Sequence, residues 1–222
     1  MDTLECIKTR RSVRKYRTEP VDWDKISIIL EAAKSAPSAG NLQNWKFIVV
    51  TDEEKRRSLA EACLQQYWMV EAPVHIIVVA EPEKAIRFYG IRGDRLYSTQ
   101  NCAASIQNIL LAANSCGLGS CWVGAFDENE VKRILSVAEE ARPQAVITIG
   151  YADETPPEPV HYTLENVCFF ERWGSRIKDI DAVLGHYGKK LHKHIDATKT
   201  GIAKHFENIK GKLAEKFKKK EK

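Results

Sequence analysis

The chain has 222 residues, of which 44% are hydrophobic and 29% are charged, a composition typical of a soluble protein with one large or two small domains. It has no apolar run of about eighteen residues, which argues against a transmembrane helix. Its N-terminus, MDTLECIKTRR, lacks an apolar signal core, so we expect a cytoplasmic protein. Its six cysteines form no CxxC pair, so we expect buried thiols and no metal site.

The charge is unevenly distributed along the chain. Residues 185–222 hold twelve lysines and four acidic residues, a net charge of +8, whereas the whole chain carries +4. The rest of the chain therefore carries −4. We predict a mildly acidic body with a basic tail, and any argument for an anionic partner applies only to the tail.

The first stretch with recognisable chemistry is TRRSVRKY, residues 9–16. Arg10, Arg11 and Arg14 with the hydroxyl of Ser12 suit a phosphate, because guanidinium groups bind its oxygens bidentately and a hydroxyl adds a donor. The alternative interpretation is a solvated basic loop. A helix is predicted over residues 20–36, where apolar residues recur at helical spacing.

A loop rich in neutral polar groups follows at residues 36–45, APSAGNLQNW. It offers a hydroxyl and three amides but no charge, so it can satisfy the carbonyl and imide edge of a heterocycle without acid–base chemistry. Strands are predicted over 46–50 and over 73–80, the second of them fully buried because it is apolar almost throughout. A helix is predicted over 53–66, and residues 81–95 are expected to form a polar connection.

The stretch from Leu96 to Phe126 contains no charged residue. A helix that is apolar nearly all round is normally buried, so we predict a central core helix ending near Gly117. A strand should begin at Cys121, and Gly124 interrupts it; glycine inside a strand often marks a bulge or a close approach of ligand to backbone. The alternative is an ordinary core helix and strand.

After Phe126 we predict a helix over 127–136, a core strand over 144–150 and a Pro-rich extended arm over 151–163. The order of elements predicts a mixed central sheet flanked by helices, in the α+β class. The sequence contains no GxGxxG, P-loop, HExxH or GxSxG motif.

Several motifs in a fixed order together resemble the nitroreductase family of FMN-dependent oxidoreductases. The resemblance covers roughly residues 4–173. It rests on the following segments: RRSVRKY at 10–16, PSAGNLQNW at 37–45, EAP at 71–73, GLG at 117–119, WVGAF at 122–126 and IGYA at 149–152.

The resemblance implies an intertwined homodimer with FMN bound where the subunits meet. Residues 1–174 would form the FMN-binding domain, with 151–174 as an arm toward the partner subunit. The cofactor-binding residues that it implies are Arg10, Arg11, Ser12, Arg14, Pro37, Ser38, Ala39, Gly40, Asn41, Gln65, Val123 and Gly124, the last through its backbone N–H near flavin N5.

One departure concerns the end of the arm. The family usually has an Arg or Lys there that reaches the FMN phosphate, whereas this chain has PVHYT at 159–163. His161 is the candidate replacement, and its charge would depend on pH. The alternative is an exposed arm residue without a role.

The resemblance implies a ping-pong reaction in which hydride passes from NAD(P)H through flavin N5 to a nitroaromatic, a quinone or a similar acceptor. No side chain need act as an acid or base, because the flavin carries the chemistry. Residues 81–95 would form a lid, with Phe88, Tyr89 and Arg92 presented to an anionic aromatic substrate. Alternatives are a reductive dehalogenase, a flavin-fragmenting enzyme, or a non-catalytic flavin-binding module docked by its tail.

The tail, residues 175–222, shows an eleven-residue apolar repeat from Leu184 to Phe217. This period predicts a nearly straight amphipathic helix. It could pack on protein, contact a membrane surface through residues 184–220, or remain a disordered solubilising segment. Because aromatic interleaving is absent, we expect no nucleic-acid partner.

Overall fold

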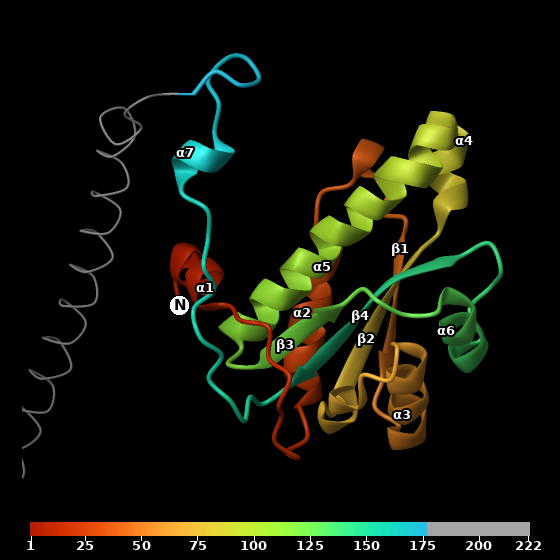
Figure 1. Ribbon diagram of the computed structural model, residues 1–222. Coiled ribbons are helices and arrows are strands. Elements are labelled where there is room, and N and C mark those ends of the chain that lie inside the picture. The colour runs from red at the N-terminus through yellow and green to blue at the C-terminus, as the bar shows by residue number, and fades with distance from the viewer. Residues whose placement is uncertain (177–222) are drawn as a thin grey trace, which may run out of the picture. The chain divides into compact units, whose positions relative to one another are not determined.

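A computed structural model describes residues 1–176 of the chain (Figure 1). The chain divides into two compact units, Met1–Glu158 and Pro159–Lys222. The amphipathic helix predicted for residues 175–222 falls almost wholly outside the described residues. It stays a prediction.

A four-stranded sheet with the order β1-β2-β4-β3 forms the centre of the first unit. Its strands are β1 (Trp45–Val50), β2 (Val74–Ala80), β3 (Gly119–Val123) and β4 (Arg142–Gly150). Each neighbouring pair is antiparallel. We expected a mixed sheet. Among the described residues, the one parallel pairing is an isolated bridge between Ser12 and Ser120, outside the four strands.

The helices follow the predicted order with shifted ends. They are α1 (Thr3–Thr9), α2 (Trp23–Lys34), α3 (Glu53–Ala62), α4 (Pro82–Arg92), α5 (Ser98–Ser115), α6 (Glu128–Leu135) and α7 (Leu164–Val167). Short helical turns occupy Ala39–Asn41, Tyr67–Glu71 and Gly93–Tyr97. Helix α3 ends earlier than predicted, because Leu64 and Gln65 take φ values of +59° and +61°, outside the right-handed helical region.

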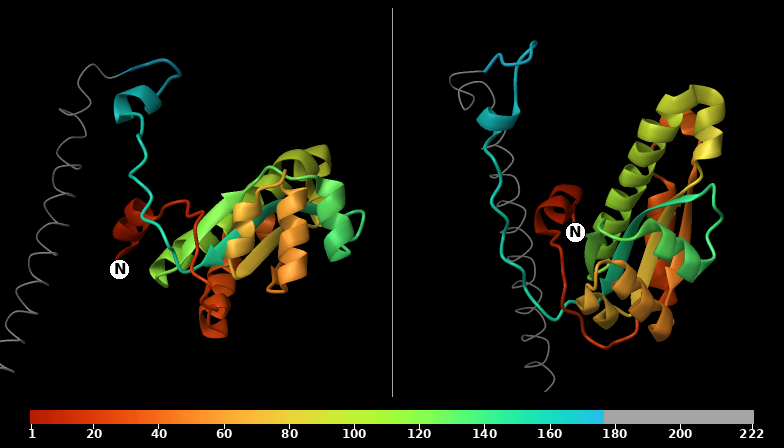
Figure 2. Two further views of the ribbon diagram at one scale, coloured as in Figure 1. Left: turned by 60° about the horizontal axis from the view of Figure 1, so that its bottom comes forward. Right: turned by 45° about the vertical axis from the view of Figure 1, so that its right-hand side comes forward.

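Helices cover both faces of the sheet (Figure 2), and an apolar cluster lies on each face. Helices α2 and α5 pack on one face, around buried residues such as Ile29 and Ile106. Helix α3, the turn Tyr67–Glu71 and α6 pack on the other, around Leu59 and Met69. Strand β2 is buried at every residue because it lies inside the sheet and is covered on both faces.

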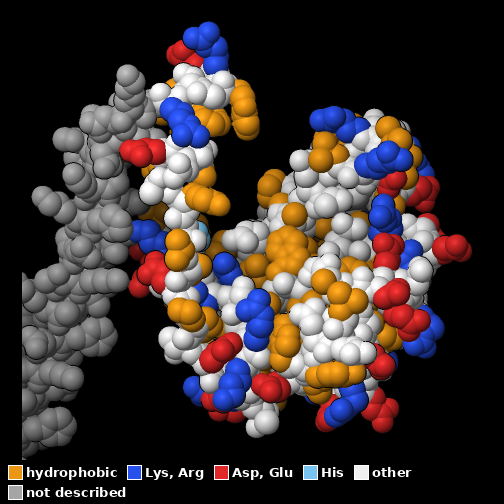
Figure 3. Space-filling view, in the orientation of Figure 1, with side chains coloured by type: hydrophobic (Ala, Val, Ile, Leu, Met, Phe, Trp, Pro, Cys, Tyr) orange, Lys and Arg blue, Asp and Glu red, His pale blue; other side chains and the backbone are white. Residues whose placement is uncertain are grey.

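Helix α5 confirms the predicted core helix, with one difference. A stripe from Ser98 to Ala113 is buried, whereas other residues of the helix, Gln107 among them, remain partly or fully exposed. The exposed part is still uncharged, since α5 contains no acidic or basic residue. In the view of Figure 3, uncharged side chains cover the middle of the first unit and charged side chains lie around them.

The polar connection expected at residues 81–95 is wrong, because most of it is helical. Pro82 occupies the first turn of α4, where its missing N–H costs nothing, and Ala85 is fully buried. The helix is kinked at Gly90, with φ +58° and ψ −144°, and continues into a π-helical turn at Gly93–Tyr97. Glycine tolerates this backbone conformation and other residues do not.

In the second unit, residues 159–163 are extended and lead into the short helix α7. Val160, Tyr162 and Trp173 are almost fully exposed there, and the Trp173 ring meets Phe169 edge-on at 5.1 Å. Within residues 1–176, no helix has the length and apolar character needed to cross a bilayer.

Candidate active site

The arginine-bearing segment 10–17 runs along the sheet edge and is held by its backbone. Val13 N–H donates to Ser120 O at 3.0 Å. The amides of Arg14 and Lys15 both donate to one carboxylate oxygen of Glu154, at 2.6 and 3.1 Å. This carboxylate, about 140 residues away in sequence, fixes the backbone on either side of the Arg14 side chain.

Tyr16 anchors the same segment from beneath. Its hydroxyl donates to Val13 O at 2.6 Å and shares a hydrogen bond with Thr148 Oγ1 at 2.8 Å. Its amide donates to Glu71 Oε2 at 3.3 Å. The ring is only 5% exposed, and burial raises the pKa of the Tyr16 phenol well above its ordinary value, so the hydroxyl stays protonated and donates.

The arginine side chains of this segment differ in their surroundings. Arg14 lies over the Trp68 ring, 5.8 Å from its centroid. Arg11 turns back and donates to the carbonyls of Lys8 and Arg10, at 2.6 and 2.9 Å. Neither Arg10 nor Arg14 forms an ion pair within residues 1–176, so both charges are available to an anion.

A cavity of about 350 Å³ opens beside this segment. Arg10 and Arg11 line it from one side, and Ser120 and Glu154 from the other. The cavity therefore combines two cations and a hydroxyl with a carboxylate. Ser12 and Arg14 do not line it, so the phosphate site predicted from the sequence stays a prediction.

Gly124 follows the last residue of β3 and is exposed, whereas Val123 before it is buried. A side-chain carbon at Gly124 would meet only the Trp122 ring, so its surroundings are open. Its N–H has no hydrogen-bond partner among the described residues. Three residues after Gly124, Asp127 N–H donates to Ala62 O at 2.8 Å. This bond joins the chain after β3 to the end of α3, and Gln65 follows Ala62 by three residues.

The neutral loop at residues 37–44 is held by buried amides. Ala39 N–H donates to Asn101 Oδ1 at 2.9 Å, and Asn101 Nδ2 donates to Asn44 Oδ1 at 2.7 Å. Asn44 in turn donates to Ser98 Oγ at 3.0 Å. Asn41 takes a φ of +54°, a conformation that costs Asn less than most residues.

The arginine segment and the neutral loop lie at opposite ends of the fold. Asn114, near the end of α5, donates to Thr9 Oγ1 at 2.9 Å, whereas Asn101, near its start, holds Ala39. These two asparagines are roughly 20 Å apart along the helix axis at 1.5 Å per residue. The sheet register agrees. The neutral loop leads into the start of β1, which lies beside Ala80 and, through Ala80, beside the Arg142 end of β4. The arginine segment lies at the other end of β4, where Thr148 and Gly150 adjoin Tyr16.

Comparison with known proteins shows the family of this chain. The family model described as "Nitroreductase family" matches residues 7–69 and 64–151. This chain belongs to the nitroreductase family.

Individual relatives extend this match to the nitroreductase fold. A protein of Methanothermobacter thermautotrophicus named "Putative NADH dehydrogenase/NAD(P)H nitroreductase" is 39% identical over 162 residues, 70% of this chain and 80% of that protein. "FMN reductase [NAD(P)H]" of Bacillus subtilis is 27% identical over 172 residues, 71% of this chain and 69% of that protein. The structure of an FMN-dependent nitroreductase from Clostridium difficile superposes with a TM-score of 0.67 at 28% identity, covering 77% of this chain and all of that one.

Two sets of the predicted site residues of this nitroreductase lie far apart, whereas Val123 and Gly124 lie at the end of β3 and Gln65 just after α3. Arg10, Arg11, Ser12 and Arg14 lie in one segment at one end of the sheet, and Pro37–Asn41 lie at the other end. His161 belongs to the second compact unit, so its role stays a prediction.

Sequence reasoning missed three residues that hold the arginine segment: Trp68, Thr148 and Glu154. No local motif marks them, since each meets the segment across more than fifty residues of chain. Glu71 belongs to the recognised EAP segment, but its contact with the Tyr16 amide was not apparent. Tyr16 was part of the recognised motif, but its anchoring role was not apparent.

Cys63, Cys102 and the buried histidine lie in the core, whereas the Cys121 thiol lies close to Ser12 and Arg14. Four of the six cysteines are buried as thiols, and burial raises the pKa of both Cys63 and Cys102 to about 12. His75 is fully buried in β2 and its Nε2 lies 2.9 Å from Met69 O. Among residues 1–176, no group of His, Cys, Asp and Glu is arranged to hold a metal ion.

Proposed function

We propose that this nitroreductase passes hydride from NAD(P)H, by a ping-pong reaction on FMN, to a small acceptor such as a nitroaromatic or a quinone. Membership of the family makes it an FMN-dependent NAD(P)H oxidoreductase. The observation that carries the proposal is the pair of arginines without an ion pair within residues 1–176: Arg10 lines a cavity, and the backbone at Arg14 is held by the Glu154 and Tyr16 contacts.

The residues present fit FMN. Arg10 and Ser12 offer a cation and a hydroxyl for its phosphate and ribityl chain, while Arg14 offers a second cation whose backbone is fixed. Gly124, which follows the buried Val123, offers an exposed backbone N–H without a partner among the described residues. Gln65 and the neutral loop 37–41 add amide groups for the heterocycle.

We assign the completion of each FMN site to a second copy of the chain. A flavin ring that contacts Arg14 does not reach the loop at Ala39 of the same chain, because the two lie at opposite ends of α5 and of the sheet. The loop of a partner subunit supplies the missing half.

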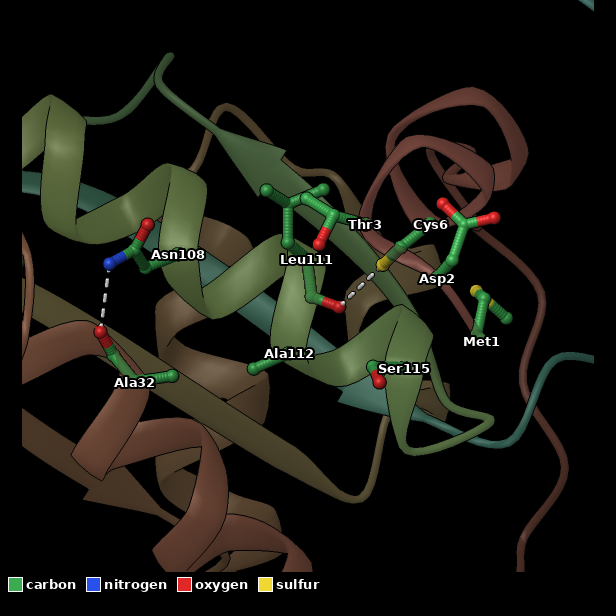
Figure 4. Close-up of a pocket in the computed structure, with 9 residues that line it drawn as sticks. All are labelled: Met1, Asp2, Thr3, Cys6, Ala32, Asn108, Leu111, Ala112 and Ser115. Carbon is green, nitrogen blue, oxygen red and sulfur yellow. Dashed lines mark hydrogen bonds between the residues drawn. The ribbon is translucent and has the colours of Figure 1, made fainter. Parts of the chain in front are cut away.

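The surface of α5 supports such a homodimer. Its exposed part carries no charge, and a groove of about 260 Å³ runs between it, α1 and α2 (Figure 4). Leu111 and Ala112 line that groove. A second copy would bury this uncharged surface, since subunit interfaces are depleted in charged residues at their centres.

When bound, FMN would supply the hydride chemistry. The protein would bind the flavin, orient it and adjust its reduction potential. A fixed positive charge at Arg14 would favour electron uptake by a bound flavin. The Glu154 and Trp68 contacts hold Arg14 in position before any ligand binds, which reduces the reorganisation needed. For a nitroaromatic acceptor the net reaction is NAD(P)H + H⁺ + ArNO₂ → NAD(P)⁺ + ArNO + H₂O.

The remaining assignments belong to the same proposal. Residues 1–174 form the FMN-binding domain, and residues 151–174 are the arm that reaches the partner subunit. His161 on this arm takes the place of the basic phosphate ligand. Phe88, Tyr89 and Arg92 lie on the acceptor side of the site.

The first test is a spectrum of the purified protein, followed by anaerobic addition of NADH or NADPH. We expect bound FMN that bleaches with at least one reductant. Arg14→Gln should weaken FMN binding about tenfold or more, since a charge-assisted contact is lost. Arg17→Gln is the matched control, because Arg17 pairs with Glu19 at 3.6 Å on the same segment. A colourless protein that takes up no added FMN would refute the proposal.

A heterodimer tests the shared site. Arg14→Gln damages one half, and Asn41→Asp damages the other while keeping a side chain that tolerates positive φ. When the two variants are co-expressed with different tags and isolated as heterodimers, one of two sites is intact, so about 0.5 FMN per chain should bind with wild-type affinity. If each site were built from a single chain, the heterodimer would have no wild-type site.

A further inference from the structure

Helix α4 and the π-helical turn after it carry a compact cluster of two tyrosines and one arginine. The rings of Tyr89 and Tyr97 meet edge-on with centroids 5.1 Å apart. Arg92 Nε donates to Tyr97 Oη at 3.0 Å, and its guanidinium carbon lies 5.5 Å from the centroid of the Tyr97 ring. The guanidinium is therefore oriented by both a hydrogen bond and an aromatic face.

This cluster adjoins the neutral loop that the proposed function places at the flavin. The Tyr89 hydroxyl packs so closely on Gly40 that a methyl group at Gly40 would overlap it. Gly40 also takes a φ of +56°, which glycine adopts without strain. A molecule stacked on the loop 37–41 would therefore lie beside Tyr89. Tyr89 contacts the Tyr97 ring, and Arg92 contacts the same ring.

Arg92 lacks a counter-ion, whereas three ion pairs occupy neighbouring charges: Arg87 with Glu83 at 3.1 Å, Lys84 with Glu81 at 3.4 Å, and Arg142 with Asp94 at 3.8 Å. Arg95 on the following turn is likewise exposed and unpaired within residues 1–176, but only Arg92 is oriented by Tyr97. Within residues 1–176 Arg92 has no carboxylate partner, and it is exposed. An oriented and uncompensated guanidinium is a binding group for carboxylate.

Apolar surface is available next to this charge. Phe88 is 67% exposed and its ring lies 6.5 Å from that of Tyr89 at an interplanar angle of 51°. Two tilted aromatic faces beside a cation match a planar ring that carries an anionic substituent.

We infer that the electron acceptor is an aromatic carboxylate, bound through its carboxylate by Arg92 and through its ring by Tyr89 and Phe88. The inference rests on the proposed function and narrows the acceptor class from nitroaromatics in general to anionic ones. Arg92 is a specificity-determining residue, and the reacting group of the acceptor points toward the flavin at loop 37–41.

The test compares 4-nitrobenzoate with 4-nitrobenzamide, which have nearly the same shape and differ in charge. Each is assayed as acceptor, with saturating NAD(P)H, in the holoenzyme with wild-type sequence, Arg92→Gln and Arg87→Gln. Both substitutions remove one positive charge from α4, but Arg87 is already paired with Glu83.

We expect the wild type to prefer nitrobenzoate in kcat/KM by about tenfold or more, the range expected for a charge-assisted contact. Arg92→Gln should abolish that preference and leave nitrobenzamide within about twofold of wild type, and Arg87→Gln should preserve it. Equal preference in the wild type, an equal loss for both compounds in Arg92→Gln, or the same loss in Arg87→Gln would overturn the inference.

A binding measurement gives a readout besides turnover. Benzoate, which cannot be reduced here, should perturb the flavin absorbance of oxidised holoenzyme, and Arg92→Gln should raise its Kd about tenfold. The phosphate of NADPH is another anion that Arg92 could bind. If Arg92→Gln changed only the preference for NADPH over NADH in kcat/KM, the assignment of Arg92 to the acceptor would be overturned. A chain without FMN would instead refute the proposed function itself.

Discussion

Removal of the Tyr16 hydroxyl tests how the arginine segment is held. In Tyr16→Phe the Val13 carbonyl loses its donor at 2.6 Å and the Thr148 hydroxyl loses its partner at 2.8 Å. Each buried polar group left unpaired costs about 1–3 kcal/mol. Because the threonine hydroxyl can rotate, we expect a total loss of roughly 2 kcal/mol in the free energy of unfolding.

The assay is urea unfolding of the apoprotein at fixed protein concentration, with FMN affinity measured in parallel. Tyr67→Phe is the control, because Tyr67 is 52% exposed and makes no side-chain hydrogen bond among the described residues. A double-mutant cycle with Thr148→Val should show a coupling energy of about 1 kcal/mol. FMN affinity should fall together with stability, since Val13 lies between Ser12 and Arg14. A cycle without coupling, or equal losses in Tyr16→Phe and Tyr67→Phe, would refute this account of the segment.

Three further predictions follow from burial and backbone conformation. Burial lowers the pKa of His75 to about 4, so the folded protein binds fewer protons than the unfolded chain below pH 6.5. Stability is therefore complete above that pH and falls by up to about 3 kcal/mol toward pH 4, a dependence that urea titrations should show for wild type and not for His75→Asn. Gly40→Ala should cost about 1–3 kcal/mol from positive φ and overlap with the Tyr89 hydroxyl, and Tyr89→Phe should recover part of that loss in the same unfolding assay. Cys63 and Cys102, fully buried with pKa about 12, should resist a thiol reagent at pH 8 that modifies the partly exposed Cys116, as mass mapping would reveal.

Local pattern predicted most of the elements of this nitroreductase. The charge-free run after Leu96 predicted α5, and the apolar run at 73–80 predicted β2, because burial selects the residue types of a core element directly. The arginine motif and the neutral loop were recognisable because each is contiguous in sequence. Sequence reasoning missed the helix at residues 82–92. The charged residues there suggested a polar loop more strongly than Pro82 and Ala85 suggested a helix.

The sequence alone determined the family and the order of the elements, and it predicted the residue types of the site. Only the tertiary structure decided which of these residues meet. It put Glu154 on the amide of Arg14 and separated the arginine segment from the loop at Ala39. The physical reason is that periodicity and turn chemistry act over a few residues. Contacts between residues more than fifty positions apart depend on how the sheet and α5 close, which no local pattern encodes.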